Sequence, residues 1–109
     1  MKTSELQRPA LDWAVAKCAE LPFPFAYDDY GREYPVSPST LWAQGGPIIE
    51  REKTAIKENG YGHWFAKVGA GKWMRGPTPL IAAMRCCVAS KLGKEIDVPE
   101  ALLNQKGEM

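Results

Sequence analysis

The segment TPLIAAMRCCVASKLG, residues 78–93, carries the clearest structural signal in the chain and decides the fold. Thr78 suits an N-cap because its hydroxyl can accept a hydrogen bond from a first-turn amide, and Pro79 suits the first helical position. Gly93 is typical of the residue that ends a helix. The apolar residues recur at helical spacing and are Leu80, Ile81, Met84, Val88 and Leu92. The segment therefore predicts a helix over residues 78–92 with one apolar stripe.

Two further helices are predicted before this segment. The first spans residues 9–19, opens on Pro9 and has an apolar stripe formed by Leu11, Ala14, Val15 and Cys18. The second spans residues 40–53, with Ser39 or Thr40 as its N-cap. Gly45-Gly46-Pro47 is expected to kink or break this helix, because proline lacks the amide hydrogen that a helix interior uses.

Strand signals lie between the helices. Residues 23–30 alternate Phe23, Phe25 and Tyr27 with smaller residues, which predicts a strand that buries these three rings. Residues 55–58 and 63–68 flank an Asn-Gly turn and predict a hairpin with Trp64, Ala66 and Val68 on one face. Residues 72–76 are either a third strand or a loop.

The predicted fold class is α/β, and more narrowly α+β, with a small sheet of three or four strands packed between or against three main helices. The chain has 109 residues, of which 45% are hydrophobic and 25% charged, as in one folded domain. We expect that domain to span residues 1–103 and residues 104–109 to form a frayed tail.

The net charge of +1 hides a basic central third, because residues 55–93 hold six Lys/Arg against Glu58 alone. Such a region can attract anions locally. It is sparse in interleaved aromatic and basic motifs, so we do not expect tight general nucleic-acid binding.

Cysteine usage indicates a reducing compartment. Cys18, Cys86 and Cys87 are odd in number and two are adjacent, which is a poor disulfide framework. No apolar run approaches the roughly 20 residues that a membrane-spanning helix needs. We expect free thiols, a cytoplasmic location and no membrane partner.

Three stretches resemble the phage NinX-like proteins. They are LDWAVAK at residues 11–17, SPSTLWAQGGPIIERE at residues 37–52 and GPTPLIAAMRC at residues 76–86. Leu41 stands where that family has an acidic residue. The resemblance implies a bacteriophage or prophage origin, the cytoplasm of the bacterial host, and the phage ABA-sandwich architecture, in which a sheet lies between helices. It implies no established activity, so the chemistry has to come from the residues.

Catalysis, metal binding and a cofactor are not indicated. His63 is the one histidine, and a nucleophile–base pair would need a cysteine or serine in hydrogen-bond reach of it and a third group to orient it, so the cysteines are expected to be packing residues. No metal-ligand spacing occurs, and Gly69-Ala70-Gly71-Lys72 lacks the rest of a phosphate-binding loop. We expect no catalytic residue, no metal ligand, no cofactor and no enzyme.

The candidate site combines two helix starts with aromatic and cationic side chains. Helix N-termini present free N–H groups that bind anions, and tryptophan stacks on flat ligands. We expect the two helix starts to lie together in one concave, electropositive pocket with Trp42 on its wall. The candidate ligand-binding residues are Trp42, Gln44, Gly45, Gly46, Trp73, Arg75, Thr78 and Arg85.

Structural interpretations of the same residues stay open. Gly45-Gly46-Pro47 can be a helix kink that lets another element pack closely, and Arg85 can pair with Glu50 or Glu52 to tie two helices together. The tryptophans can be core.

The leading functional hypothesis is a non-catalytic binder of a small anionic, nucleotide-like ligand. Trp42 and Trp73 would stack on a base and Gln44 would read a polar edge, while phosphates would bind Arg75, Thr78 and Arg85. By analogy with other phage proteins, such a binder would sequester a host immune signal. One alternative is a protein that inhibits a host defence complex, of anti-CRISPR or anti-restriction type. A second is a replication or recombination accessory factor. A homo-oligomer in which a second subunit completes the pocket is also left open.

Overall fold

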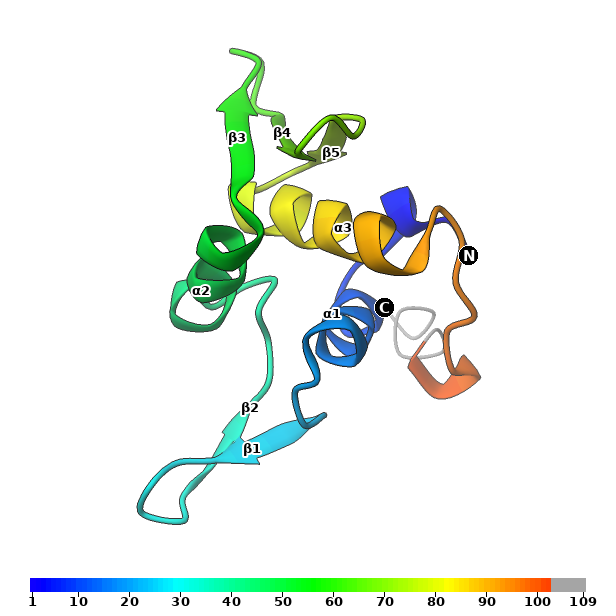
Figure 1. Ribbon diagram of the computed structural model, residues 1–109. Helices are drawn as coiled ribbons and strands as arrows, with labels where there is room; N and C mark the ends of the chain where they lie inside the picture. Colours follow the sequence, from blue (N-terminus) through cyan, green and yellow to red (C-terminus); the bar gives the residue numbers. More distant parts are fainter. Residues whose placement is uncertain (103–109) are drawn as a thin grey trace.

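A single helix lies at the centre of the molecule in the computed structural model, which describes residues 1–102 (Figure 1). This helix, α3, spans Pro79–Leu92. The Thr78 hydroxyl accepts a hydrogen bond from the Ile81 amide at 3.1 Å, and Gly93 follows the helix at a φ of +96° that favours glycine. The helix, its cap and its ending residue are therefore confirmed.

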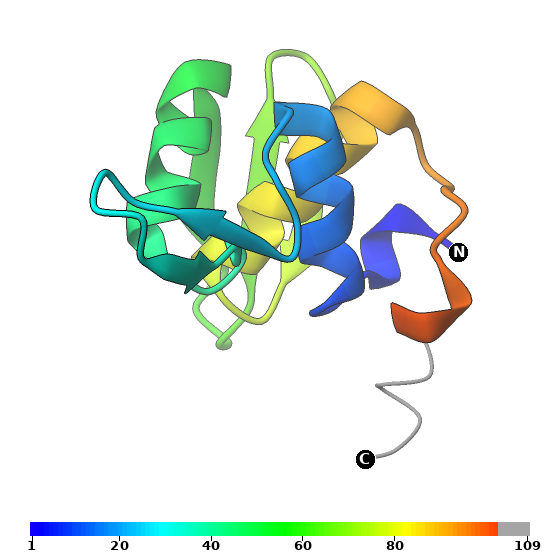
Figure 2. The same ribbon diagram turned by 90° about the horizontal axis from the view of Figure 1, so that it is seen from below.

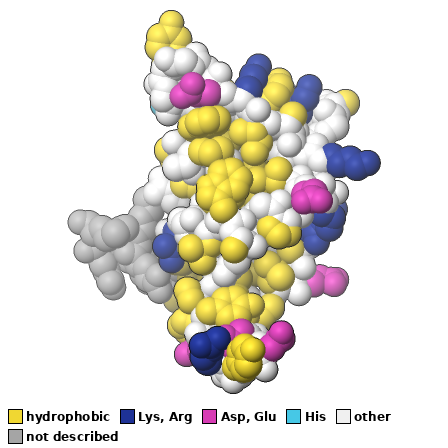
Figure 3. Space-filling view, turned by 90° about the vertical axis from the view of Figure 1, so that its left-hand side faces the viewer, with side chains coloured by type: hydrophobic (Ala, Val, Ile, Leu, Met, Phe, Trp, Pro, Cys, Tyr) yellow, Lys and Arg dark blue, Asp and Glu magenta, His cyan; other side chains and the backbone are white. Residues whose placement is uncertain are grey.

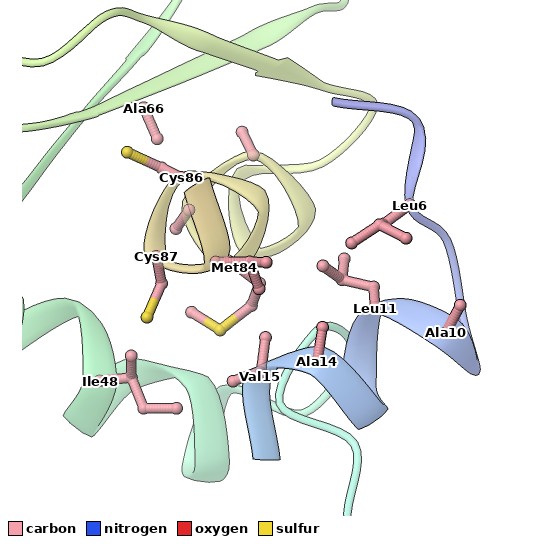
Figure 4. Packing of buried hydrophobic residues seen from close by; sticks show 13 residues of the cluster. Leu6, Ala10, Leu11, Ala14, Val15, Ile48, Ala66, Met84, Cys86 and Cys87 are labelled. Atoms are coloured by element: carbon pink, nitrogen blue, oxygen red, sulfur yellow. The ribbon is translucent and has the colours of Figure 1, made fainter. Parts of the chain in front are cut away.

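Helix α3 is buried on most sides, which goes beyond the single stripe that the sequence predicts. Besides Leu80, Met84 and Val88, its buried residues include Ala82, Ala83, Arg85, Cys86 and Cys87. The helix is buried because it has neighbours on two sides: Cys86 faces Ala66 of a sheet, while Met84 and Cys87 face two other helices (Figure 4). A helix enclosed in this way needs small or apolar residues around most of its circumference.

A three-stranded antiparallel sheet covers one side of α3. Strands β3 (Thr54–Glu58), β4 (Trp64–Val68) and β5 (Met74–Gly76) lie in the order β3-β4-β5. Trp64, Ala66 and Val68 all pack into the core on the α3 side, as the alternation predicts. The segment over residues 72–76, left open as strand or loop, contributes β5.

Helices α1 (Ala10–Ala19) and α2 (Trp42–Glu52) lie on the other side of α3 (Figure 1). Both predicted helices are confirmed, but two details of α2 were wrong. The helix continues through Gly45-Gly46-Pro47, and Ile48 directly after the proline is buried in the core. The N-cap is Leu41, without a side-chain cap bond, rather than Ser39 or Thr40.

The side chain of Asp12 in α1 explains the missing cap. This buried carboxylate accepts hydrogen bonds from the Ser39 amide at 2.9 Å and from the Ser37 hydroxyl at 3.0 Å. The Thr40 hydroxyl lies 2.6 Å from that of Ser37. Residues 37–40 therefore connect the segment before α2 to Asp12 of α1, and none of them caps α2.

A second antiparallel sheet is formed by the short hairpin of β1 (Phe25–Tyr27) and β2 (Glu33–Pro35). It lies beneath α1 and α2, at the end of the molecule opposite the larger sheet (Figures 1 and 2). The expected orientation of β1 was wrong: Ala26 is buried, whereas Phe25 and Tyr27 are exposed. Buried Ala26 packs with Ala16 of α1 and with Val36, where two large rings would not fit between elements this close.

Over residues 1–102, the chain is an α+β fold with three main helices and two small antiparallel sheets. The central layer is α3, between the β3-β4-β5 sheet and the pair α1 and α2. In the part of the chain that the structure describes, the sheet packs against helices on one face only and its other face is open (Figure 1), so the expected arrangement, in which a sheet lies between helices, was wrong for the β3-β4-β5 sheet. Before α1, the 3-10 helix η1 (Thr3–Glu5) lies near the end of α3, where the Thr3 hydroxyl donates to the Gly93 carbonyl. The predicted tail at residues 104–109 lies outside the described residues.

Candidate functional site

Gln44 and Gly45, two of the eight predicted site residues, make structural contacts. The Gln44 side-chain oxygen accepts from the Ser37 amide at 2.6 Å, and its nitrogen donates to the Pro35 carbonyl at 2.8 Å. A Cβ at Gly45 would overlap the Pro38 carbonyl oxygen and would lie 2.6 Å from the Leu80 side chain. Gly45 therefore permits the close approach of α2 to α3, in agreement with the packing interpretation of this glycine.

Arg85, another of the predicted site residues, bonds to the backbone of two other segments of the chain. Its Nε donates to the Leu6 carbonyl and its Nη1 to the Arg75 carbonyl, both at 2.9 Å. Burial, and after it the charge of Arg75, lower the pKa of Arg85 from its usual value. The expected pairing with Glu50 or Glu52 is not found among the described residues, and Lys91 is the α3 residue that contacts Glu52, at 3.3 Å.

The starts of α2 and α3 do lie side by side, as predicted. They line a cavity of about 240 Å³, which we call the helix-entrance cavity and which contains Trp42 and Thr78 together with Ser39, Thr40, Pro79, Leu80 and Ile81. Trp42 is 56% exposed. Gly46, on the first half of α2, has open space around it.

The helix-entrance cavity is not electropositive in the way we expected. No charged side chain is among its lining residues, and neither Arg75 nor Arg85 reaches it. Its polar groups are hydroxyls, of which the Ser39 Oγ is buried and has no hydrogen-bond partner among the described residues. A pocket of this kind suits a small polar group better than a phosphate of high charge.

Trp73 and Arg75 lie elsewhere, on the open face of the three-stranded sheet. Lys57, Phe65 and Arg75 are directly opposite one another across β3, β4 and β5, so their side chains share a face. Since Trp64 and Ala66 point toward α3, Phe65 and Lys67 point away from it. We call the group Lys57, Phe65, Lys67, Trp73 and Arg75 the outer sheet face.

The side chains of two lysines on the outer sheet face lie over the ring of Trp73. The Lys57 Nζ lies 4.2 Å from the centroid of the Trp73 ring, and the Lys67 Nζ lies 5.0 Å from it. Both distances are those of cation–π contacts. Trp73 as a whole residue is 38% exposed.

The cations of the outer sheet face are not neutralised by carboxylates. In the part of the chain that the structure describes, the ion pairs involve Arg8, Arg32, Arg51 and Lys91. Lys57, Lys67 and Arg75 take part in none of them. The positive charge that the sequence places in the central third is thus available to an anion here.

The sequence reasoning missed two features. It did not single out Lys57 and Lys67, although the predicted hairpin already placed them on the face opposite Trp64 and Ala66. It also missed a groove of about 710 Å³ between the β1-β2 hairpin, the end of α1 and α2.

This hairpin groove is mainly apolar and aromatic. Its rings are those of Phe25, Tyr27 and Tyr34, and its lining also includes Gln44 and Arg51. Figure 3 shows that hydrophobic side chains gather on this side of the molecule, from the sheet down to the hairpin. The signal was the row of rings in residues 23–27, which the alternation assigned to the core.

The described residues do not provide what a metal site or a membrane-spanning helix requires. Within residues 1–102, no three His, Cys, Asp or Glu side chains come together in a group that could hold a metal ion. None of the helices described is both long enough and apolar enough to span a bilayer.

The fold and these surfaces define a small α+β domain with an open basic and aromatic sheet face, separate from an apolar groove. The chain matches the family described as "Bacteriophage P22, NinX" over residues 2–91. It belongs to this family and is a phage accessory protein, as the resemblance implied. No curated protein matches the chain.

Proposed function

We propose that the protein binds a nucleotide-like anion on the outer sheet face without catalysing a reaction. The observation that carries the proposal is the gathering of Lys57, Lys67 and Arg75 around Trp73, with no carboxylate partner among the described residues. A base stacks on an aromatic ring, and phosphates bind cations. Trp73 and Arg75 keep the roles that the sequence suggested, whereas Lys57 and Lys67 replace Arg85.

Binding without catalysis is supported by the state of the nucleophiles. Burial raises the pKa of the Cys86 thiol, so that this sulfur is a poor thiolate. A hydrogen bond to Cys87, followed by burial, raises the pKa of Cys18. The same contact lowers the pKa of Cys87, but Cys87 is buried in the core and out of reach of a substrate. In a phage protein, a binder of this type would act by sequestering a nucleotide-like signal of the host's immune response.

Isothermal titration with ATP, AMP and tripolyphosphate tests the proposal. We expect saturable binding of the nucleotides, and a loss of about 1–3 kcal/mol of binding free energy in Trp73→Leu. Lys57→Gln and Lys67→Gln should each weaken binding by about 1.5–3 kcal/mol, the value of a charge-assisted hydrogen bond.

Lys17→Gln is the matched control. Lys17 also lies over a tryptophan, with its Nζ 5.2 Å from the centroid of Trp13, but on α1 and away from the sheet. This variant should bind nucleotides like the unchanged protein. The absence of nucleotide binding would contradict the proposal. So would an equal loss of affinity in Lys57→Gln, Lys67→Gln and Lys17→Gln.

A second candidate function is inhibition of a host defence protein through the hairpin groove. It is favoured by the exposure of Tyr27 and Phe25, which are 67% and 48% exposed, because aromatic anchors dominate protein interfaces. Phe25→Ser with Tyr27→Ser tests it in phage infection of hosts that carry individual defence systems. If the variant no longer protects the phage from a defence system but still binds nucleotides, the inhibition belongs to the groove. If the protection of the phage is unchanged, the groove has no part in the inhibition.

A further inference from the structure

The outer sheet face carries two aromatic rings rather than one. Phe65 lies directly opposite Arg75 in the pairing of β4 with β5, and Trp73 is two residues before Arg75. The two rings are therefore diagonal neighbours on one face, at a backbone separation of roughly 7–8 Å. A mononucleotide has one base and can stack on only one of them.

The cations are spread over the same area as the rings. Lys57 and Arg75 flank Phe65 from the two outer strands, and Lys67 follows Phe65 two residues later on β4. Since neighbouring strands are about 4.8 Å apart, the two flanking residues stand roughly 10 Å apart across the sheet. The lysine ammonium groups lie over Trp73, but their flexible stems are anchored at this backbone spacing and can extend to successive phosphates, whereas one terminal phosphate group would contact only part of the cations.

We infer that the outer sheet face binds single-stranded nucleic acid, with two successive bases stacked on Phe65 and Trp73 and the connecting phosphates on Lys57, Lys67 and Arg75. The inference rests on the proposed nucleotide binding and specifies its ligand as two or more linked nucleotides. An open antiparallel sheet with aromatic side chains is a general platform for two or three unstacked bases.

The chemistry of the face favours this occupant over two others. Duplex DNA hides its bases in the stack, so the rings of a flat sheet have nothing to stack on. An acidic peptide satisfies the cations but leaves Phe65 and Trp73 without partners of matching shape. Stacking tolerates every base, so the structure points to binding with little sequence preference. The sequence predicts no tight general nucleic-acid binding because interleaved aromatic and basic motifs are sparse along the chain, whereas the outer sheet face gathers its aromatic and basic residues from neighbouring strands.

Fluorescence anisotropy with labelled oligo(dT) of one, two, four and eight nucleotides tests the inference. Affinity should rise at least fivefold between one and four nucleotides. In Phe65→Leu this gain should shrink at least fivefold, whereas Trp73→Leu should weaken the binding of every length. Circular dichroism of each variant confirms that it folds, and Lys17→Gln is the control for lost charge.

Salt dependence gives an independent count of the phosphate contacts. With three cations on a single strand, raising the salt from about 50 to about 200 mM should lower the affinity for the four-nucleotide strand about 20-fold. With one cation removed in Lys67→Gln, the same change should lower it about 7-fold.

The outcomes separate this inference from the proposed function. Equal affinities for one and four nucleotides, with binding still dependent on Trp73, would overturn the inference and leave nucleotide binding intact. The absence of any binding would overturn both. Duplex DNA or tetraglutamate that binds as tightly as the single strand would overturn the inference, because neither needs the two rings.

Discussion

At the residue scale, the adjacent glycines Gly45 and Gly46 have opposite roles. A Cβ at Gly45 would overlap the Pro38 carbonyl and the Leu80 side chain, while a Cβ at Gly46 would meet nothing within 4 Å. We expect Gly45→Ala to lower the free energy of unfolding by about 3 kcal/mol, the upper range for overpacking. Urea denaturation measures this loss.

Gly46→Ala is the matched control on the same helix. Alanine favours a helix more than glycine does, so this variant should raise the free energy of unfolding by about 0.5–1 kcal/mol. Equal effects of the two substitutions would show that the close packing of α2 against Pro38 and Leu80 is not what determines stability at this position.

Arg85 shows how one side chain can hold distant parts of the chain together. The guanidinium, which belongs to α3, donates hydrogen bonds to the carbonyl of Leu6 before α1 and to that of Arg75 in β5. Arg85→Met would leave both carbonyls without this donor, and we expect a loss of about 3 kcal/mol in urea denaturation. Arg75→Met keeps the Arg75 carbonyl and removes an exposed side chain, so it should change stability by less than about 0.5 kcal/mol.

At the element scale, Glu52 joins the end of α2 to the end of α3. Burial raises its pKa, but hydrogen bonds and charge from Arg51 and Lys91 outweigh burial, and the pKa is lowered overall from its usual value of 4.5. Because the folded-state pKa is below the unfolded one, this stabilisation is present above about pH 4.5 and is lost as the pH falls through the folded-state value.

Glu52→Gln tests this contact between the two helices. The variant should be less stable than the unchanged protein at pH 7, by up to about 1 kcal/mol. The difference should shrink as the pH is lowered below 4.5, as followed by thermal unfolding across a pH series. A difference that is independent of pH would assign the effect to packing instead of charge.

Sequence reasoning predicted the elements better than their surroundings. The cap, proline and glycine of α3 are local signals, and they placed that helix correctly because each acts within one turn. The predicted N-cap of α2 was wrong because Asp12, 25 and 27 residues earlier, accepts from the Ser37 hydroxyl and the Ser39 amide and so holds this segment against α1, and the helix begins only after Leu41. A contact between distant segments leaves no periodic trace in the sequence.

In the candidate site too, local signals were predicted correctly and contacts between distant segments were not. Trp42 and Thr78 were placed together because both stand at predicted helix starts, and the structure brings these starts together. Trp73 and Arg75 belong to another surface, since Arg75 in β5 and Trp73 directly before β5 lie on the face opposite α3. The sequence showed that these two residues follow a turn and precede a helix. It did not show which face of the sheet their side chains occupy, because a shift of the strand register by one residue would move them to the other face.

At the scale of the whole molecule, the two candidate surfaces lie at opposite ends. The β3-β4-β5 sheet and the β1-β2 hairpin are separated by the helical layers, so a ligand on one does not touch the other (Figure 1). We expect Phe25→Ser with Tyr27→Ser to leave nucleotide affinity unchanged within twofold in titration calorimetry. Changes larger than this would mean that the two ends are energetically coupled.

The central position of α3 also has a consequence for synthesis on the ribosome. Helix α1 ends at Ala19 and α3 ends at Leu92, so roughly 70 residues must be translated before α1 meets the helix it packs against. At about 5–20 residues per second, this delay is about 4–15 s. During that interval Leu11 and Val15 lack their core partners on α3, and the nascent chain exposes them to chaperones or to other nascent chains. The core around α3 can therefore close only after α3 has been translated.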